Sequence, residues 1–220
     1  MDEPLLPPEI AELNIDPARP LVVVDVDEVL GMFMRGFETF IGLHGLEMRI
    51  DRFALFQNIY RPGETTHVEI SHGRRLFDAF FECEPQLMDV APGAAEGLAG
   101  LAAHANIVIL TNAPVACRAA RARWLMDKGL PYPLVVGAGP KGPPVAAIAS
   151  RTPHATAFVD DLLPNLDSVE REAPAVHRFQ SVADERLRPF APSAPDRHPR
   201  HDHWPDLAEA IARKLRIRPR

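Results

Sequence analysis

Short apolar runs alternate with amphipathic stretches over most of this chain of 220 residues. The run Leu-Val-Val-Val at 21–24 is β-branched and ends in acidic residues, which is typical of a buried parallel strand. Strands and helices are predicted to alternate, because similar runs are separated by segments with helix start and stop signals. The further strands are expected at 106–110, 134–136, 155–159 and 175–179, and the helices at 92–104, 114–128, 165–172 and 205–215. This alternation predicts an α/β fold with a parallel sheet covered by helices on both faces.

Residues 31–89 interrupt the alternation, because this connection is far longer than the loops of an ordinary βαβ unit. Phe33, Phe37 and Phe40 recur at helical spacing, which predicts a small helical insertion with its own apolar interior. An insertion at the carboxyl end of a strand would overhang the place where α/β sheets bind ligands. We therefore predict a core domain of residues 1–30 and 90–220 and a helical cap of residues 31–89. Eight of the eleven phenylalanines lie in the cap: Phe33, Phe37, Phe40, Phe53, Phe56, Phe77, Phe80 and Phe81.

Proline accounts for 23 of the 220 residues, about twice its usual share. Two stretches are especially rich in it, residues 1–19 and residues 187–204. We interpret the first as an extended leader and the second as an irregular connection, both outside the core. Within the helix at 114–128, Arg118, Arg121 and Arg123 are expected on a polar side.

The charge and the chain start exclude several classes of protein. The net charge of −6 gives no support for electrostatic tracking of nucleic acid. The first residues lack the basic and apolar regions of a secretory signal, and no apolar run approaches the length of a membrane span. Cys83 and Cys117 lack metal-ligand spacing and make no disulfide framework. We expect a cytoplasmic protein with neither a nucleic acid nor a membrane as partner.

Polar signatures follow four of the predicted strands. Asp25-Val26-Asp27 follows the first strand, Thr111-Asn112 the second, Lys141 lies after the third, and Asp160-Asp161 follows the fourth. Each one alone also occurs as a helix cap, a turn or a solvated loop charge. Asp25 and Asp27 are two residues apart in an extended segment, so their side chains are expected to point the same way. Four crowded carboxylates are unfavourable without a cation, and oxygen ligands without His or Cys suit Mg²⁺.

Together, in this order, the four signatures resemble the motifs of the haloacid dehalogenase-like (HAD) superfamily over about residues 20–180. The resemblance implies a Rossmann-like sheet with strand order 5-4-1-2-3 and a Mg²⁺ site built from Asp25, Asp27, Asp160 and Asp161. It implies that Asp25 attacks a phosphoryl group to form an aspartyl-phosphate. The Thr111 hydroxyl and the Asn112 N–H would hold the phosphoryl oxygens, and Lys141 would supply positive charge to Asp25 and to the transferring group.

Asp27 indicates the branch of the superfamily. Displacement of an alkoxide benefits from a general acid, whereas displacement of a halide does not, so an acid two residues after the nucleophile resembles the phosphatases. Glu28 departs from the family pattern, because glycine is commoner there; its side chain is expected to alter the turn or the polarity of the pocket. The expected activity is Mg²⁺-dependent hydrolysis of a small phosphorylated metabolite. A nucleotidase, a phosphotransferase or mutase, and a binding protein that keeps the fold without turnover remain alternatives.

Three further features favour plainer interpretations. The phenylalanines are expected to form the interior of the cap, with one or two near Phe33 also able to face substrate. Arg74 and Arg75 could reach an anionic group of the substrate, although an exposed helix surface is the preferred interpretation. His198, His201 and His203 lie in a Pro-rich polar stretch, where a solvated loop is favoured over a metal site.

Overall fold

Five parallel strands form the central sheet in the computed structural model, which describes residues 6–83 and 87–217. The order across the sheet is β5-β4-β1-β6-β7. When the five strands are renumbered 1 to 5 by their order in the chain, the order across the sheet becomes 3-2-1-4-5. Read from the opposite edge this is 5-4-1-2-3, so the expected order is confirmed. Their bounds are β1 (Leu21–Val24), β4 (Asn106–Thr111), β5 (Leu134–Val136), β6 (Thr156–Asp160) and β7 (His177–Gln180).

The register of the central strands brings their carboxyl ends to one level. Val24 of β1 lies opposite Ile109 of β4 and Val159 of β6. The Asp25 N–H then donates to the carbonyl oxygen of Val159 at 3.0 Å, which extends the pairing by one residue. The acidic residues that follow β1 and β6 are therefore held at the same edge of the sheet.

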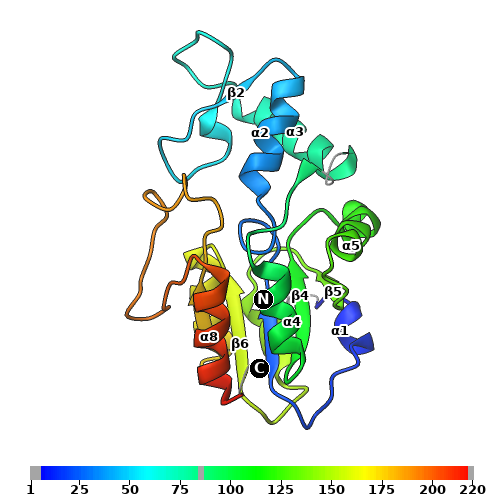
Figure 1. Cartoon of the computed structure of the whole chain (residues 1–220). Coiled ribbons are helices and arrows are strands. Elements are labelled where there is room, and N and C mark those ends of the chain that lie inside the picture. Colours follow the sequence, from blue (N-terminus) through cyan, green and yellow to red (C-terminus); the bar gives the residue numbers. More distant parts are fainter. Residues whose placement is uncertain (1–5, 84–86, 218–220) are drawn as a thin grey trace.

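Alternate residues of β1 enter two separate hydrophobic clusters, one on each face of the sheet. Val22 and Val24 pack with α4 (Ala94–Ala102) and α8 (Trp204–Leu215), which lie together over one face in Figure 1. Leu21 and Val23 join the cluster that includes side chains of α1, α6 and α7. These helices are α1 (Glu9–Glu12), α6 (Gly142–Ala149) and α7 (Leu163–Glu172). Because both faces are covered, β1 is apolar throughout, and β4 and β6 are apolar between their terminal residues, as the sequence pattern predicts.

The insertion, residues 31–89, extends beyond one end of the sheet (Figure 1). Its described residues, 31–83 and 87–89, include two helices, a 3₁₀ turn and a small antiparallel strand pair that the sequence pattern does not predict. One hydrophobic cluster continues from Phe37 and Phe80 in the insertion to Val24 in the sheet, so the domain boundaries at residues 30 and 90 stay a prediction. The elements of the insertion are α2 (Phe33–Leu43), β2 (Glu47–Met48), η1 (Phe56–Asn58), β3 (Ile59–Tyr60) and α3 (Ile70–Cys83).

Both Pro-rich stretches pack against the fold, so the prediction that they lie outside the core is wrong for their apolar residues. In the leader, Ile10 and Leu13 are buried in the cluster beneath α6 and α7. In the second stretch, Leu187 is buried in the cluster on the other face. Apolar side chains interspersed among the prolines can still be buried, because proline excludes regular structure and not packing.

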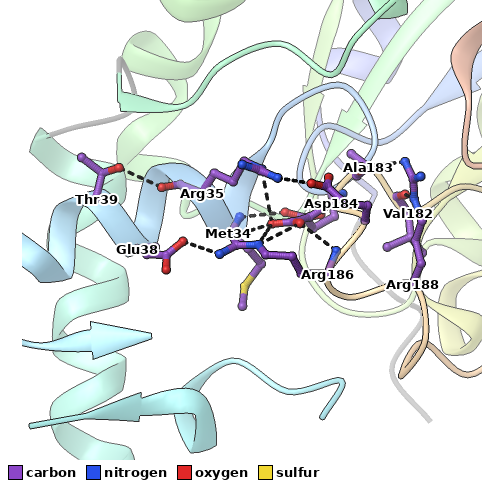
Figure 2. Close-up of polar contacts among 11 residues, drawn as sticks. Met34, Arg35, Glu38, Thr39, Val182, Ala183, Asp184, Arg186 and Arg188 are labelled. Carbon is purple, nitrogen blue, oxygen red and sulfur yellow. Dashed lines mark hydrogen bonds and ion pairs between the residues drawn. The ribbon is translucent and has the colours of Figure 1, made fainter. Parts of the chain in front are cut away.

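The segment of residues 181–203 is tied to α2 by charged groups (Figure 2). The Arg186 guanidinium contacts Glu38 of α2 at 2.7 Å and Asp184 at 2.7 Å. Arg35 of α2 reaches back to Asp184 and to Glu185. The Arg35 side chain is 46% exposed and the Arg186 side chain is 33% exposed. Because such exposed ion pairs add little stability, this network chiefly fixes the relative position of α2 and the segment.

Among the residues that the structure describes, none of the helices is both long and apolar enough to cross a membrane.

Candidate active site

A buried lysine joins the ends of β1 and β6. The Lys141 ammonium lies 2.6 Å from Asp25 Oδ1 and 2.8 Å from Asp160 Oδ2, and its side chain is 1% exposed. Lys141 comes from the loop after β5 and directly precedes α6, which packs against α7. Three segments that are far apart in the sequence thus meet in one ion-paired group, as the sequence signatures predict.

Asp160 and Asp161 differ in what they contact. Asp160 is fully buried and accepts hydrogen bonds from the Leu162 N–H at 2.9 Å and the Asn165 amide at 3.0 Å, in addition to Lys141. Asp161 lines the open cavity, and no donor to its carboxylate is found among residues 6–83 and 87–217. Asp160 is therefore held in place by protein groups, while Asp161 is available to a ligand.

The carboxylates outnumber the cation that neutralises them. Burial, together with the charges of Asp160 and Asp27, raises the pKa of Asp25 to about 7 against the opposing effect of Lys141. Burial and the charges of Asp160 and Asp25 raise the pKa of Asp161 well above its ordinary value. Burial alone would lower the pKa of Lys141, but Asp160 and Asp25 together raise it. The group therefore favours binding a proton or a further cation.

Three of the four residues proposed for Mg²⁺ share one possible site. Single carboxylate oxygens of Asp25, Asp160 and Asp161 all lie within 4.8 Å of one another, and all three residues are buried. Hard oxygen donors with excess negative charge are the set that Mg²⁺ prefers, so these residues fit the ion. The Asp27 side chain does not belong to this cluster, so its predicted part in binding the metal stays a prediction.

The Asp27 carboxylate is instead paired with Arg121 of α5 (Arg118–Asp127). One guanidinium nitrogen, Nη2, lies 2.9 and 3.2 Å from the two oxygens of Asp27. Arg121 is 1% exposed and lies over the rings of Phe81 and Trp124, so its expected place on a polar side of the helix with Arg118 and Arg123 is wrong. A buried guanidinium needs a carboxylate partner, which explains why Asp27 turns toward it. Arg121 carries no sequence signal that separates it from its exposed neighbours Arg118 and Arg123.

The end of β4 contributes Thr111 and Asn112 unequally. Asn112 lines the cavity, and its amide donates to the Gly139 carbonyl at 2.8 Å, which ties this strand to the loop that carries Lys141. Thr111 is fully buried, and its hydroxyl oxygen accepts the Ala113 N–H at 3.2 Å. The structure does not bring Thr111 to the cavity wall, so its role toward a phosphoryl group stays a prediction.

Glu28 occupies a left-handed turn immediately after Asp27, with φ of 60°. Its buried carboxylate accepts the Met34 N–H at 2.7 Å and the Asp184 N–H at 3.0 Å, while its carbonyl oxygen accepts the Ala183 N–H at 2.8 Å. Burial raises the pKa of Glu28 to about 7, although these two N–H groups act in the opposite direction. Glu28 thus adopts the backbone turn that glycine would favour at this position. Its side chain also links the end of β1 to α2 and to the 181–203 segment.

We expect Glu28→Gly and Glu28→Ala both to destabilise the fold, with Ala the worse by about 1 kcal/mol. Both remove the acceptor of two buried N–H groups, but only glycine adopts the left-handed turn without strain. Urea unfolding of the two variants measures this difference, and equal losses would show that the turn is not strained.

The cost of removing Glu28 should also depend on pH. Its pKa rises from 4.5 to about 7 on folding, so its contribution is fully present below pH 4.5 and is lost as the pH rises through 7. Both variants should therefore lose less stability at pH 8 than at pH 5. A larger loss of stability at pH 8 would mean that the folded state stabilises the ionised Glu28 carboxylate more than the protonated one.

The candidate site opens into a cavity of about 520 Å³. Asp25, Asp27, Asp161 and Lys141 line it, and so does Phe33 of the insertion, which also packs on Phe37. Phe33 is therefore both interior and cavity wall, as the sequence suggests. Arg74 and Arg75 are exposed on α3 and do not line the cavity, so the structure does not bring them to a substrate.

The three C-terminal histidines do not converge. His198 is buried and contacts Asp167 at 3.0 Å, close to Glu170, while His201 is half-buried and His203 is exposed. This second acidic group is already neutralised, because Arg197 pairs with both Asp167 and Glu170. Cys117 is buried in the core, and the side chain of Cys83 lies outside the described part of the chain.

No model of a known protein family matches this sequence, and no curated protein matches it either. Solved structures do match it. A HAD family hydrolase from Deinococcus radiodurans, with phosphate and sodium bound, superposes with a TM-score of 0.61 at 14% identity over 93% of this chain and 100% of its own. A Bacillus subtilis protein assigned to the HAD hydrolases, with magnesium bound, gives 0.58 at 13% identity over 88% and 98%.

A HAD-superfamily hydrolase of subfamily IA from Geobacter sulfurreducens gives a TM-score of 0.54 at 16% identity, over 89% of this chain and 97% of its own. The parallel five-stranded sheet with helices on both faces agrees with this likeness. The chain therefore has the fold of the HAD-superfamily hydrolases.

Proposed function

We propose that this protein is a Mg²⁺-dependent phosphohydrolase that cleaves a small phosphomonoester through an aspartyl-phosphate on Asp25. The observation that carries the proposal is the buried group in which Lys141 joins Asp25 to Asp160, with Asp161 open to the same cavity. The phosphate in the Deinococcus radiodurans structure and the magnesium in the Bacillus subtilis structure support the same chemistry on this fold.

In this proposal Asp25 acts as the nucleophile. An oxygen of its carboxylate would form a bond to phosphorus while the bond from phosphorus to the ester oxygen breaks. Lys141, 2.6 Å from Asp25, supplies positive charge at the place where a dianionic phosphate meets an anionic nucleophile. When bound to the carboxylates, Mg²⁺ would supply the remaining charge neutralisation.

In this proposal Asp27 is the general acid for the leaving group. It lines the cavity with Asp25, and Arg121 holds both of its oxygens. In the protonated form it would give its proton to the departing alkoxide, and its carboxylate would then take a proton from the water that attacks the aspartyl-phosphate. That second step releases inorganic phosphate and restores both residues.

The purified protein should release phosphate from p-nitrophenyl phosphate in Mg²⁺ and lose this activity in excess chelator. The expected loss is complete to within background, because, within residues 6–83 and 87–217, four acidic side chains line the cavity and Lys141 is the one cation beside them. Failure to release phosphate from p-nitrophenyl phosphate and from a panel of phosphomonoesters would favour a binding protein. Turnover only when an acceptor alcohol is added would indicate a phosphotransferase.

A further inference from the structure

The cavity beside Asp25 has one polar end and a long apolar wall. Eleven of its eighteen lining residues are apolar. The acidic and amide side chains come from the turn after β1 and from the ends of β4 and β6 with the start of α7, whereas much of the apolar wall comes from the insertion and the 181–203 segment. The principal apolar side chains are Phe33, Phe53 and Phe77 of the insertion, Leu162 and Leu163 near the start of α7, and Leu187 of the 181–203 segment.

The aromatic part of this wall is held in place by other rings. Phe33 stacks on Phe81 with centroids 5.7 Å apart, and Phe77 meets Phe81 edge-on at 4.7 Å. Phe77 also contacts Phe56 at 6.1 Å. Rings fixed in this way need little reordering when an apolar group enters, which favours binding of such groups.

The described residues of the lining offer no charge partner for a second anionic group on a substrate. Lys141 is the one cation among these described lining residues, and Asp25 and Asp160 already neutralise it. Glu28 adds a fourth acidic side chain to the wall. The nearby Arg35 and Arg186 do not line the cavity and are paired with acidic residues of α2 and the 181–203 segment (Figure 2).

We propose that the preferred substrate is a phosphomonoester whose alcohol is apolar and aromatic or alkyl, without a carboxylate, a second phosphate or several hydroxyl groups. The phosphate would meet Asp25 and the metal-binding carboxylates, and the alcohol would lie against Phe33, Phe53 and Phe77. This inference rests on the proposed phosphohydrolase function and assigns its substrate class. An unpaired carboxylate buried against this wall would be strongly unfavourable.

A matched pair of esters tests the assignment. Benzyl phosphate and 4-carboxybenzyl phosphate share one skeleton and similar leaving alcohols, and differ in a carboxylate remote from the reacting atoms. We expect kcat/KM to be at least about 100-fold higher for benzyl phosphate. Equal values, or a preference for the carboxylated ester, would overturn the assignment.

Substitutions in the apolar wall test whether its phenylalanines determine which phosphomonoester is preferred. Phe77→Ala and Phe53→Ala should each lower kcat/KM for benzyl phosphate about tenfold and leave methyl phosphate within about threefold of wild type. Two positions are used because Phe77 also packs on Phe81, whereas Phe53 makes no ring contact with another aromatic side chain in the described part of the protein. Arg74→Ala, on the same helix as Phe77 but exposed, is the matched control and should change neither ester. An equal loss for both esters in folded variants would contradict the assignment.

A binding measurement separates this inference from the proposed function. Benzylphosphonate and 4-carboxybenzylphosphonate cannot be hydrolysed at the P–C bond, so their effect on the melting temperature in Mg²⁺ reports binding alone. Stabilisation by benzylphosphonate only would support the apolar pocket even if no ester is turned over, in which case the proposed function fails by itself. Turnover of methyl phosphate with no preference in either the ester or the phosphonate pair would overturn this inference alone.

Discussion

Asp25→Asn is expected to lower kcat/KM for every phosphomonoester by at least about 1,000-fold, because an amide oxygen cannot replace the carboxylate as nucleophile. The substitution keeps the size of the side chain, and Lys141 keeps its partner Asp160 at 2.8 Å. It also removes one charge from a group whose repulsion helps to raise the pKa of Asp25 to about 7. We therefore expect a melting temperature close to that of the wild type, so that the loss of activity can be attributed to the loss of the nucleophile and not to unfolding.

Asp27→Asn gives the comparison. Loss of a general acid costs about 100- to 10,000-fold and should be smallest for p-nitrophenyl phosphate, whose leaving group needs little protonation. The loss for Asp25→Asn should be the same for all esters, since every one of them must react with the nucleophile. Because Asp27 is the partner of the buried Arg121, its variant must be assayed below its own melting temperature.

The decisive measurement is phosphate release by Asp25→Asn purified free of wild-type enzyme. Turnover above about 1% of wild type would place the nucleophile elsewhere. Phosphate trapped on the wild-type chain during turnover, and absent from the variant, would identify the aspartyl-phosphate directly.

The sheet and the candidate site could be predicted from the sequence for the same physical reason. The central strands are buried on both faces and hold continuous apolar runs, so they stand out in the sequence, and the polar residues at or just after their ends mark the edge where ligands bind. Asp25, Asn112 and Asp161 are each found immediately after such a strand, and all three line one cavity. Lys141 could be placed only through the family resemblance, since its loop has no pattern of its own.

Other features depend on contacts between distant segments. Arg121 looks like its exposed neighbours, and only the fold shows that it is buried against Phe81 with Asp27 as its partner. Glu28 adopts a backbone conformation that favours glycine because α2 and residue 184 supply N–H groups to its carboxylate. Proline content indicates irregular structure in the 181–203 segment, but it cannot show that Leu187 would form part of the cavity wall.

The metal prediction follows from the excess of carboxylates over cations. Mg²⁺ at about 100 times its dissociation constant should stabilise the wild-type protein by about 2.7 kcal/mol. For a chain of this size that corresponds to an increase in melting temperature of about 5–10 °C. The stabilisation should be lost in Asp161→Asn, because Asp161 is the carboxylate of the group for which no protein donor is found in residues 6–83 and 87–217.

The effect of Mg²⁺ should also grow with pH. The folded metal-free protein holds Asp25 with a pKa of about 7 and Asp161 with a raised pKa, so their protonated forms stabilise it at low pH. Asp25 loses that contribution as the pH rises through 7, and Asp161 loses it as the pH rises through its own raised pKa. Protons compete with the metal for the same oxygens, so the increase in melting temperature should be smaller at pH 5 than at pH 8. Without metal, Asp161→Asn should be more stable than wild type at pH 8, because it removes a buried like charge.

Asp167→Asn is the matched control for this prediction. Asp167 belongs to the other acidic group of the molecule, with Glu170 and His198, but that group is paired with Arg197 and is less buried. Its variant should keep the full response to Mg²⁺ at every pH, while Asp161→Asn should show none. If Asp161→Asn kept the response and Asp167→Asn lost it, the ion would bind beside His198, and the buried carboxylates would need a different explanation. Thermal unfolding of the three proteins at pH 5 and pH 8, with Mg²⁺ and with chelator, distinguishes these results.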